Sequence, residues 1–275
     1  MGVDAVTGPL DARSPSARPY QKIKVARDGA TLTITLFNPA RRNAIGPQMA
    51  NEILYALEDA RADADVRAIV LTGEGKAFCA GGDFAQMTSG ADAPSLAPKG
   101  DYADVLLALA KSDKPVVAKV NGHAMGGGLG LVAACTFAIA SNEAQLGTPE
   151  IDVGLFPMMI MAVLARLVPR RRLMQMMLLG ERMSGEEAAK IGLVGEACPP
   201  AELDLRVAKL CEALASKSPS TLRLGLRAFA AQDDLDLESA LPMLRERLGE
   251  CLATDDAREG LTAFLEKRAP QWTGK

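Results

Sequence analysis

The sequence predicts an α/β fold in which a core of mixed strands and helices is followed by a wholly helical region. Short strand-like apolar runs alternate with helix-type periodicity up to about residue 157, and only helix-type periodicity follows. A glycine cluster at 126–128 also separates a strand-like run from a helix-like run. With 275 residues and 48% hydrophobic content, the chain is long enough for one large core.

Strands are predicted where short apolar, β-branched runs end at turn signals. The first two flank Asp28-Gly29, which is a hairpin signal. In chain order the predicted strands cover 23–26, 31–37, 68–72, 77–79, 115–120 and 137–140. Apolar residues at helical spacing predict helices at 47–61, 102–111 and 129–135.

The second half of the chain is predicted to be helical. Ser184 precedes Glu187 by three residues, which is the spacing of a capping box and indicates a helix start. Further predicted helices cover 201–217, 219–231, 235–252 and 255–267. We therefore expect a flexible leader rich in Pro, Ser, Gly and Ala over 1–19, a core over 20–200 and a helical region over 201–275.

Composition excludes several classes of function. The formal net charge is -3, so nothing indicates a nucleic-acid partner. Apolar runs at 116–140 and 153–168 are interrupted by charged residues, glycines or proline, which indicates buried core and no membrane span. The five cysteines are scattered without a CxxC pair, which disfavours a disulfide framework or zinc site and fits a reducing compartment. The leader lacks the apolar segment of a signal peptide, and we expect a cytoplasmic protein.

Common nucleotide and hydrolase motifs are absent. The dinucleotide pattern GxGxxG fails around Gly126 because its third glycine falls on Leu131, and no P-loop surrounds Gly75-Lys76. His123 is the only histidine, which excludes a histidine metal cluster, and no GxSxG elbow accompanies it. We expect His123 to face the core near the glycine turn and to have a structural role.

Two glycine-bearing turns, 78–83 and 125–128, are the candidates for chemistry. If they lie side by side, one backbone N–H from each can point at the same oxygen, and the start of a helix adds its positive dipole end. Such an oxyanion hole stabilises a charge that develops in a transition state, each donor contributing ~3 kcal/mol. The alternative is that both are ordinary tight turns.

The ordered motifs resemble those of the crotonase superfamily, the enoyl-CoA hydratase/isomerase family, from about Tyr20 to Ala269. The matching segments are Asn38-Pro39-Ala40 through Asn43-Ala44, Ala77 to Asp83, Lys114-Pro115-Val116 through Asn121 to Gly128, Thr148 to Leu155, and Glu259 to Arg268. The resemblance implies a crotonase-type spiral of ββα turns with a C-terminal helical trimerisation region, assembled as a homotrimer or homohexamer.

The resemblance also implies a catalytic set. The amides of Gly82 and Gly127 would hold a thioester carbonyl oxygen, and Glu150 would act as acid or base. The family's other glutamate position holds Gly130, which leaves one carboxylate at the motif positions. The position of an aspartate found in a dienoyl-CoA isomerase branch holds Met158. Asp152 is a weaker candidate for a second acid.

Coenzyme A is expected as part of the substrate, an acyl-CoA thioester, with no separate cofactor and no metal. By resemblance, its adenine lies near the turns at 80–84 and 42–44, and a neighbouring subunit supplies Phe264 and Lys267 to the adenine and 3′-phosphate. Phe156, Met158 and Met159 are candidates for an acyl pocket. The implied substrate-binding residues are Arg42, Ala44, Ala80, Asp83, Phe84, Met158, Phe264 and Lys267.

The predicted function is acyl-CoA processing through an enolate, as enoyl-CoA hydratase or enoyl-CoA isomerase. An isomerase needs one group to move a proton, whereas a hydratase must also orient a water molecule. Because Gly130 leaves a single carboxylate at the motif positions, the site suits isomerisation at least as well as hydration. A third possibility is a non-catalytic acyl-CoA binding protein.

Overall fold

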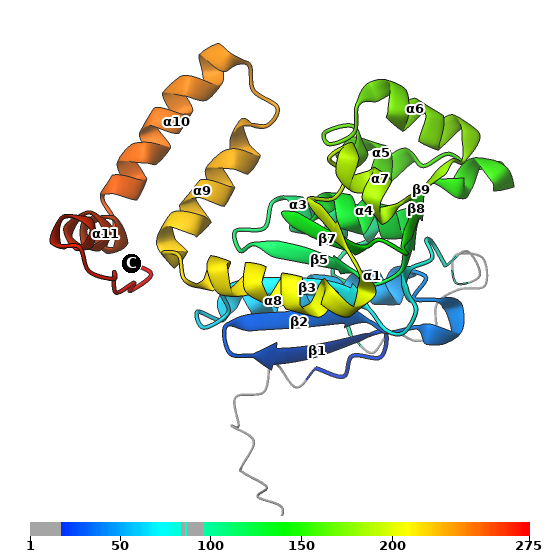
Figure 1. The fold of residues 1–275 in the computed structure, drawn as a ribbon, viewed down its shortest axis with the longest axis horizontal. Coiled ribbons are helices and arrows are strands. Elements are labelled where there is room, and N and C mark those ends of the chain that lie inside the picture. Colours follow the sequence, from blue (N-terminus) through cyan, green and yellow to red (C-terminus); the bar gives the residue numbers. More distant parts are fainter. Residues whose placement is uncertain (1–17, 84–85, 87–95) are drawn as a thin grey trace, which may run out of the picture.

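The computed structural model describes residues 18–83, 86 and 96–275, and the predicted leader lies almost wholly outside them (Figure 1). The core contains two sheets. The larger has the strand order β1-β2-β3-β5-β7-β10, and the smaller has the order β4-β6-β8-β9. The larger sheet comprises β1 (Ile23–Asp28), β2 (Thr31–Leu36), β3 (Ala68–Gly73), β5 (Val116–Val120), β7 (Phe137–Ser141) and β10 (Glu196–Cys198).

The chain alternates between the two sheets as it advances. The strands of the smaller sheet are β4 (Ala77–Cys79), β6 (His123–Met125), β8 (Gln145–Gly147) and β9 (Arg182–Ser184). β3, β5 and β7 join the larger sheet, and the strands that follow them, β4, β6 and β8, join the smaller one. β4 pairs with β6 and β6 with β8, both in parallel. This repetition, interleaved with helices, is the expected spiral of ββα turns.

Helices cover the sheets and complete the core. They are α1 (Pro47–Ala62), α3 (Tyr102–Ala110), α4 (Gly127–Ala134), α5 (Met158–Leu164), α6 (Arg170–Leu179) and α7 (Gly185–Lys190), with short 3-10 helices η1 (Pro39–Arg41) and η2 (Pro149–Val153). α8 (Pro200–Ala215) also packs on the larger sheet, where Leu203, Val207 and Cys211 join a second apolar cluster with Val70 and Val117. By packing, the core therefore continues to α8, past the expected boundary at residue 200.

The remaining helices form an arm. α9 (Pro219–Gln232), α10 (Leu237–Leu252) and α11 (Asp255–Glu266) extend away from the rest of the molecule on one side (Figure 1). The buried carboxylate of Asp256 accepts hydrogen bonds from the hydroxyls of Ser218 and Ser220 and from the amides of Thr273 and Gly274. These bonds lower the pKa of Asp256 to about 2 despite its burial, and they fasten the C-terminal segment to the start of α9.

Most predicted elements are present within a few residues of their expected bounds. The antiparallel β1–β2 hairpin is confirmed, and so is the Ser184–Glu187 capping box at α7. The prediction of almost only helices after residue 157 missed β9 and β10. None of the helices in the described part of the chain is long and apolar enough to cross a membrane, and all five cysteines are free.

Gly128 is required by a close backbone approach. A Cβ atom placed there would lie 2.4 Å from the carbonyl oxygen of Cys79, which is well inside van der Waals contact. The start of α4 thus packs directly on the end of β4, and the two glycine-bearing turns are locked together through backbone atoms.

Gly128→Ala is expected to lower the free energy of unfolding by about 1–3 kcal/mol, because the methyl group forces two backbone segments apart. Gly249→Ala is the matched control: nothing lies within 4 Å of that position in α10, so the change should stabilise the helix by up to about 1 kcal/mol. Urea denaturation measures both. Equal effects of the two substitutions would contradict the close approach.

Candidate active site

The candidate site forms where three adjacent parallel strands end. β4, β6 and β8 lie side by side in that order, so their carboxyl ends meet at one edge of the smaller sheet. Gly82 follows β4, Gly127 follows β6 as the first residue of α4, and Glu150 follows β8 within η2. Parallel pairing therefore gathers residues that are distant in sequence, and strand ends of this kind are usual ligand sites in α/β proteins.

The two predicted oxyanion-hole turns converge. A Cβ atom built on Gly81 would lie 4.0 Å from the amide nitrogen of Gly127, and both Gly82 and Gly127 line the same pocket. Neither amide donates a hydrogen bond to any described residue. For Gly127 this follows from its place in the first turn of α4, where N–H groups have no partner within the helix. Two residues whose amides have no partner among the described residues thus line one pocket.

Backbone hydrogen bonds hold the first turn in place. Ile45 donates its amide hydrogen to the Gly81 carbonyl (2.8 Å), and the Asp83 amide donates to the Ile45 carbonyl (2.8 Å). The side chain of Arg41 pairs with the buried Asp83 carboxylate at 2.9 Å. Gly81 has a φ of 107°, which a residue with a side chain rarely adopts. The turn is therefore fixed on both sides of Gly82, whose amide stays free.

Glu150 has the environment of a proton-transfer group. Its Oε2 is buried and has no hydrogen-bond partner among the described residues. Burial raises the pKa of Glu150 above its ordinary value, and a hydrogen bond from its own backbone opposes the rise. A Cβ at Gly126 would lie 2.6 Å from Glu150 Oε1, so the glycine cluster also makes room for this carboxylate. A carboxyl group with a raised pKa is suited to exchange protons near neutral pH.

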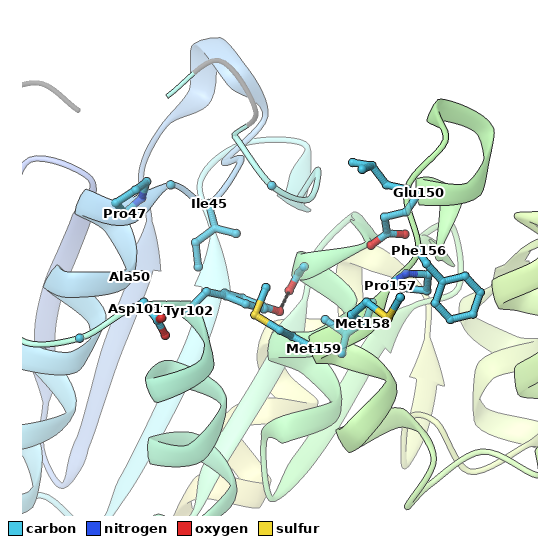
Figure 2. A pocket seen from close by; sticks show the side chains of 16 residues that line it. Ile45, Pro47, Ala50, Asp101, Tyr102, Glu150, Phe156, Pro157, Met158 and Met159 are labelled. Carbon is cyan, nitrogen blue, oxygen red and sulfur yellow. Dashed lines mark hydrogen bonds between the residues drawn. The ribbon is translucent and has the colours of Figure 1, made fainter. Parts of the chain in front are cut away.

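The pocket at these groups has a volume of about 430 Å³, within the range of small-molecule sites. One wall comes from the segment Ile45 to Pro47 and the start of α3, and the facing wall from Glu150 and the segment Leu155 to Ile160 (Figure 2). Met158 and Met159 are 65% and 50% exposed, so they lie at the open side of the pocket. Phe156, Met158 and Met159 all line it, and their role in binding an acyl chain stays a prediction.

Asp101 is the other acidic side chain that lines the pocket. Its carboxylate accepts hydrogen bonds from the amides of Ala103 and Asp104 as the N-cap of α3. Oδ1 of Asp101 is thus used in starting the helix, and the residue is exposed to water. Glu150, whose carboxylate is partly buried in the pocket, is therefore the better candidate for chemistry. Elsewhere in the described chain, no three His, Cys, Asp or Glu side chains are grouped as a metal site.

Only some of the other expected substrate-binding residues lie near the pocket. The Arg42 carbonyl accepts a hydrogen bond from the Ala80 amide at 3.0 Å, so the turns at 42–44 and 80–83, including Ala44 and Asp83, lie together as expected. Phe84 lies outside the described residues. Phe264 is 80% exposed on α11, and neither it nor Lys267 lines the pocket. Their expected role depends on a neighbouring subunit and stays a prediction.

The structure changes what the sequence led us to expect of His123 and Asp152. His123 is exposed, and its Nδ1 accepts the Gln145 amide hydrogen at 3.1 Å. The expectation that it faces the core is wrong, because His123 is the first residue of β6 and its side chain is exposed there, while Ala124 and Met125 after it are buried. Asp152 lies beside Gly180, where a Cβ would meet its carboxylate at 3.1 Å, and it does not line the pocket.

Tyr102 and Arg41 are site residues that sequence reasoning did not single out. The Tyr102 hydroxyl donates a hydrogen bond to the Gly127 carbonyl oxygen at 2.5 Å. The sequence offered one signal for Tyr102, which is the small residue Gly130 inside an apolar helix. A large side chain from another element must fill the space beside such a residue.

Known proteins resemble this chain over most of its length. A family model described as "Enoyl-CoA hydratase/isomerase" matches residues 27–275. A Bacillus subtilis (strain 168) protein named "Probable enoyl-CoA hydratase" is 35% identical over 258 residues, or 92% of this chain and 99% of that protein. The Rattus norvegicus protein "Enoyl-CoA hydratase domain-containing protein 3, mitochondrial" is 31% identical over 267 residues, or 94% of this chain and 86% of that protein. The crystal structure of enoyl-CoA hydratase from Mycobacterium smegmatis has a TM-score of 0.85 at 32% identity, covering 92% of this chain and 99% of that one.

The raised pKa of Glu150 predicts a pH-dependent effect of Glu150→Gln on stability. The folded protein binds this proton more tightly than the unfolded chain, so the contribution of Glu150 to the free energy of unfolding falls as pH rises from the unfolded pKa through the folded pKa. Glutamine carries no charge to bury. The stability of the variant relative to the original protein should therefore increase over the pH range that begins at the ordinary glutamate pKa of about 4 and extends upward to neutral pH.

Urea denaturation across that range measures the difference, and Asp152→Asn, at an exposed carboxylate, is the matched control. A difference that is independent of pH, or that shrinks as pH rises, would contradict the assigned environment of Glu150.

Proposed function

Because the chain belongs to the enoyl-CoA hydratase/isomerase family of the crotonase superfamily, we propose that this enzyme processes acyl-CoA thioesters through an enolate bound by the amides of Gly82 and Gly127. The observation that supports the proposal most strongly is the convergence of these two unpaired amides in the pocket that also contains Glu150.

The two amides suit an enolate because they are neutral donors in a largely apolar pocket. When the Cα proton of a thioester is removed, or when a nucleophile adds to Cβ of its 2-enoyl form, negative charge moves to the carbonyl oxygen. Preorganised N–H groups stabilise that charge more than they stabilise the neutral carbonyl, each by ~3 kcal/mol. The first turn of α4 adds its dipole on the same side.

Glu150 completes the set as the group that moves the proton. As a carboxylate it removes a proton from Cα of a 3-enoyl thioester, and the C–H electron pair enters the dienolate. The resulting carboxylic acid returns the proton to Cγ, so the double bond shifts to the 2 position and the carboxylate is regenerated. One such group is sufficient, and the single available carboxylate favours isomerisation as a second candidate beside hydration.

Coenzyme A enters this proposal as part of the substrate. The turns at 42–44 and 80–83 lie together, in support of the adenine site expected from the family resemblance. We further propose a cytoplasmic location, whereas the name of the rat relative places that protein in the mitochondrion.

We also propose that the arm assembles three or six subunits. On α10 the side chains of Leu237, Leu241, Leu248 and Leu252 are each more than half exposed and fall on one helical face. Leu261, Phe264 and Leu265 form a similar exposed face on α11. Contiguous apolar surfaces of this kind mark protein interfaces.

The reaction is tested with a trans-2-enoyl-CoA and with the 3-enoyl-CoA of the same chain length. Consumption of the conjugated ester to a 3-hydroxyacyl product supports hydration, and formation of the conjugated ester from the 3-enoyl form supports isomerisation. Saturable binding of both esters without turnover would support the binding-protein alternative and contradict the enzymatic proposal.

Glu150→Gln should lower turnover at least about a hundredfold while ester binding changes little, since the amide keeps the shape of the side chain and loses its proton-transfer capacity. Initial rates and a direct binding measurement check both parts. Asp152→Asn, outside the pocket, should retain full activity. Full activity of Glu150→Gln would show that another group moves the proton.

The assembly is tested by the mass in solution. Light scattering should give three or six times the 28.9 kDa of one chain. Replacing Leu241 and Leu248 by serine should shift the mass toward that of one subunit, because it removes the centre of the α10 face. A single-chain mass for the unmodified protein would contradict the proposal.

A further inference from the structure

Tyr102 is a further polar side chain of the pocket, in addition to Glu150 and Asp101. Tyr102 is the first residue of α3, and its Oη lies 2.5 Å from the carbonyl oxygen of Gly127 (Figure 2). A carbonyl oxygen can only accept a hydrogen bond, so the hydroxyl must donate its single hydrogen to Gly127. The phenol is thus bonded to Gly127, the residue whose amide belongs to the proposed oxyanion hole.

Gly130 fixes the position of this hydroxyl. A Cβ atom at residue 130 would lie 2.3 Å from Tyr102 Oη and 2.3 Å from Ile160 Cγ2. The tyrosine hydroxyl therefore fills, together with Ile160, the space that a side chain on α4 would otherwise take. The absence of a side chain at residue 130 and the presence of Tyr102 are two parts of one packing arrangement.

The oxygen of Tyr102 retains the capacity to accept hydrogen bonds. Its hydrogen is engaged by Gly127, and no described residue donates to it. Burial, the neighbouring Cys79 and the charge of Glu150 raise the pKa of Tyr102 well above its ordinary value, so the phenol stays neutral. In Figure 2, Tyr102 and Glu150 approach the pocket from two sides.

We propose that Tyr102 Oη accepts a hydrogen bond from the oxygen at Cβ of the bound acyl group, which is the attacking water in hydration and the hydroxyl of the 3-hydroxyacyl ester in the reverse reaction. This inference rests on the proposed function and deepens it. Tyr102 would favour the reaction and the ligands that place an oxygen at Cβ, namely hydration and 3-hydroxyacyl esters. A neutral phenol whose hydrogen is held elsewhere orients this oxygen without removing a proton.

The hydration step then balances with one carboxylate. The water oxygen bonds to Cβ as Glu150 takes a proton from it, and the π electrons of the double bond move through Cα to the thioester oxygen as the enolate. Protonated Glu150 gives that proton to Cα, and the enolate electrons form the new C–H bond as the carbonyl returns. Tyr102 keeps its own hydrogen on Gly127 throughout.

Tyr102→Phe tests the proposal through a ratio of two activities. Hydration of the 2-enoyl ester should fall about tenfold through loss of one hydrogen-bond acceptor. Isomerisation of the 3-enoyl ester, which involves no oxygen at Cβ, should change much less. Tyr55→Phe is the control, because that hydroxyl bonds to Ala97 on the exposed side of α1, outside the pocket. Equal losses in both activities would show that Tyr102 acts only through Gly127, and unchanged activities would show no role; either result overturns the proposal.

Binding gives a readout that does not depend on turnover. The affinity of a 3-hydroxyacyl-CoA relative to the saturated acyl-CoA of the same length should fall about tenfold in Tyr102→Phe and stay constant in Tyr55→Phe. An unchanged ratio would overturn the inference even if the protein catalyses neither reaction. Failure of the proposed function is seen separately, as absence of Glu150-dependent turnover in the unmodified protein.

Gly130→Ala reaches the same hydroxyl from α4. The added methyl group must displace Tyr102 Oη, so hydration should fall relative to isomerisation as it does in Tyr102→Phe. In the Tyr102→Phe background the same change should lower that ratio no further, because the displaced oxygen is already absent. If Gly130→Ala lowered the ratio of hydration to isomerisation by the same factor in both backgrounds, the proposed link between residue 130 and the Tyr102 hydroxyl would be contradicted.

Discussion

Parallel pairing of three very short strands is the constraint on which the site depends. β4, β6 and β8 have three residues each, and their order in the smaller sheet puts the segments that follow them at one edge. Strands this short form few hydrogen bonds, so backbone packing must help to set their alignment. Gly128 meets the Cys79 carbonyl, and Gly122 similarly approaches the Lys76 carbonyl, where a Cβ would lie at 2.1 Å. These glycines therefore allow the close backbone packing that aligns the strands.

The electrostatics of the site follow from this packing. Neither amide donates to a described residue: Gly127 begins a helix, and Gly82 lies in a turn in which the Ala80 and Asp83 amides are bonded to other groups. Glu150 is held partly buried beside the same turn, with one oxygen unpaired and a raised pKa. Each feature costs stability in the empty protein, since buried polar groups without partners are unfavourable. A thioester oxygen and a transferable proton would satisfy them, which relates the local destabilisation to the proposed reaction.

Much of the fold and of the candidate site could be predicted from the sequence, because short motifs indicate local structure. The glycine turns, the hairpin and the capping box all depend on residues near one another in the chain, whereas Glu150 was singled out only through the family resemblance. β6, β8, β9 and β10 were not predicted, since each has only three residues and includes a polar one, whereas the equally short β4 is wholly apolar and ends at a glycine turn. Tyr102 was missed for another reason: its role depends on contacts with Gly127 and Gly130, which only the folded chain brings near. The outward side chain of His123 likewise depends on the pairing of β6 with strands distant in sequence.

The proposed function requires two amides from separate turns to share one carbonyl oxygen. A crystal structure with a bound acyl-CoA thioester tests it most directly. The thioester oxygen should lie about 2.7–3.1 Å from the amide nitrogens of both Gly82 and Gly127, with the acyl chain directed toward Glu150. An oxygen bonded to only one of these amides, or a thioester bound outside this pocket, would contradict the account.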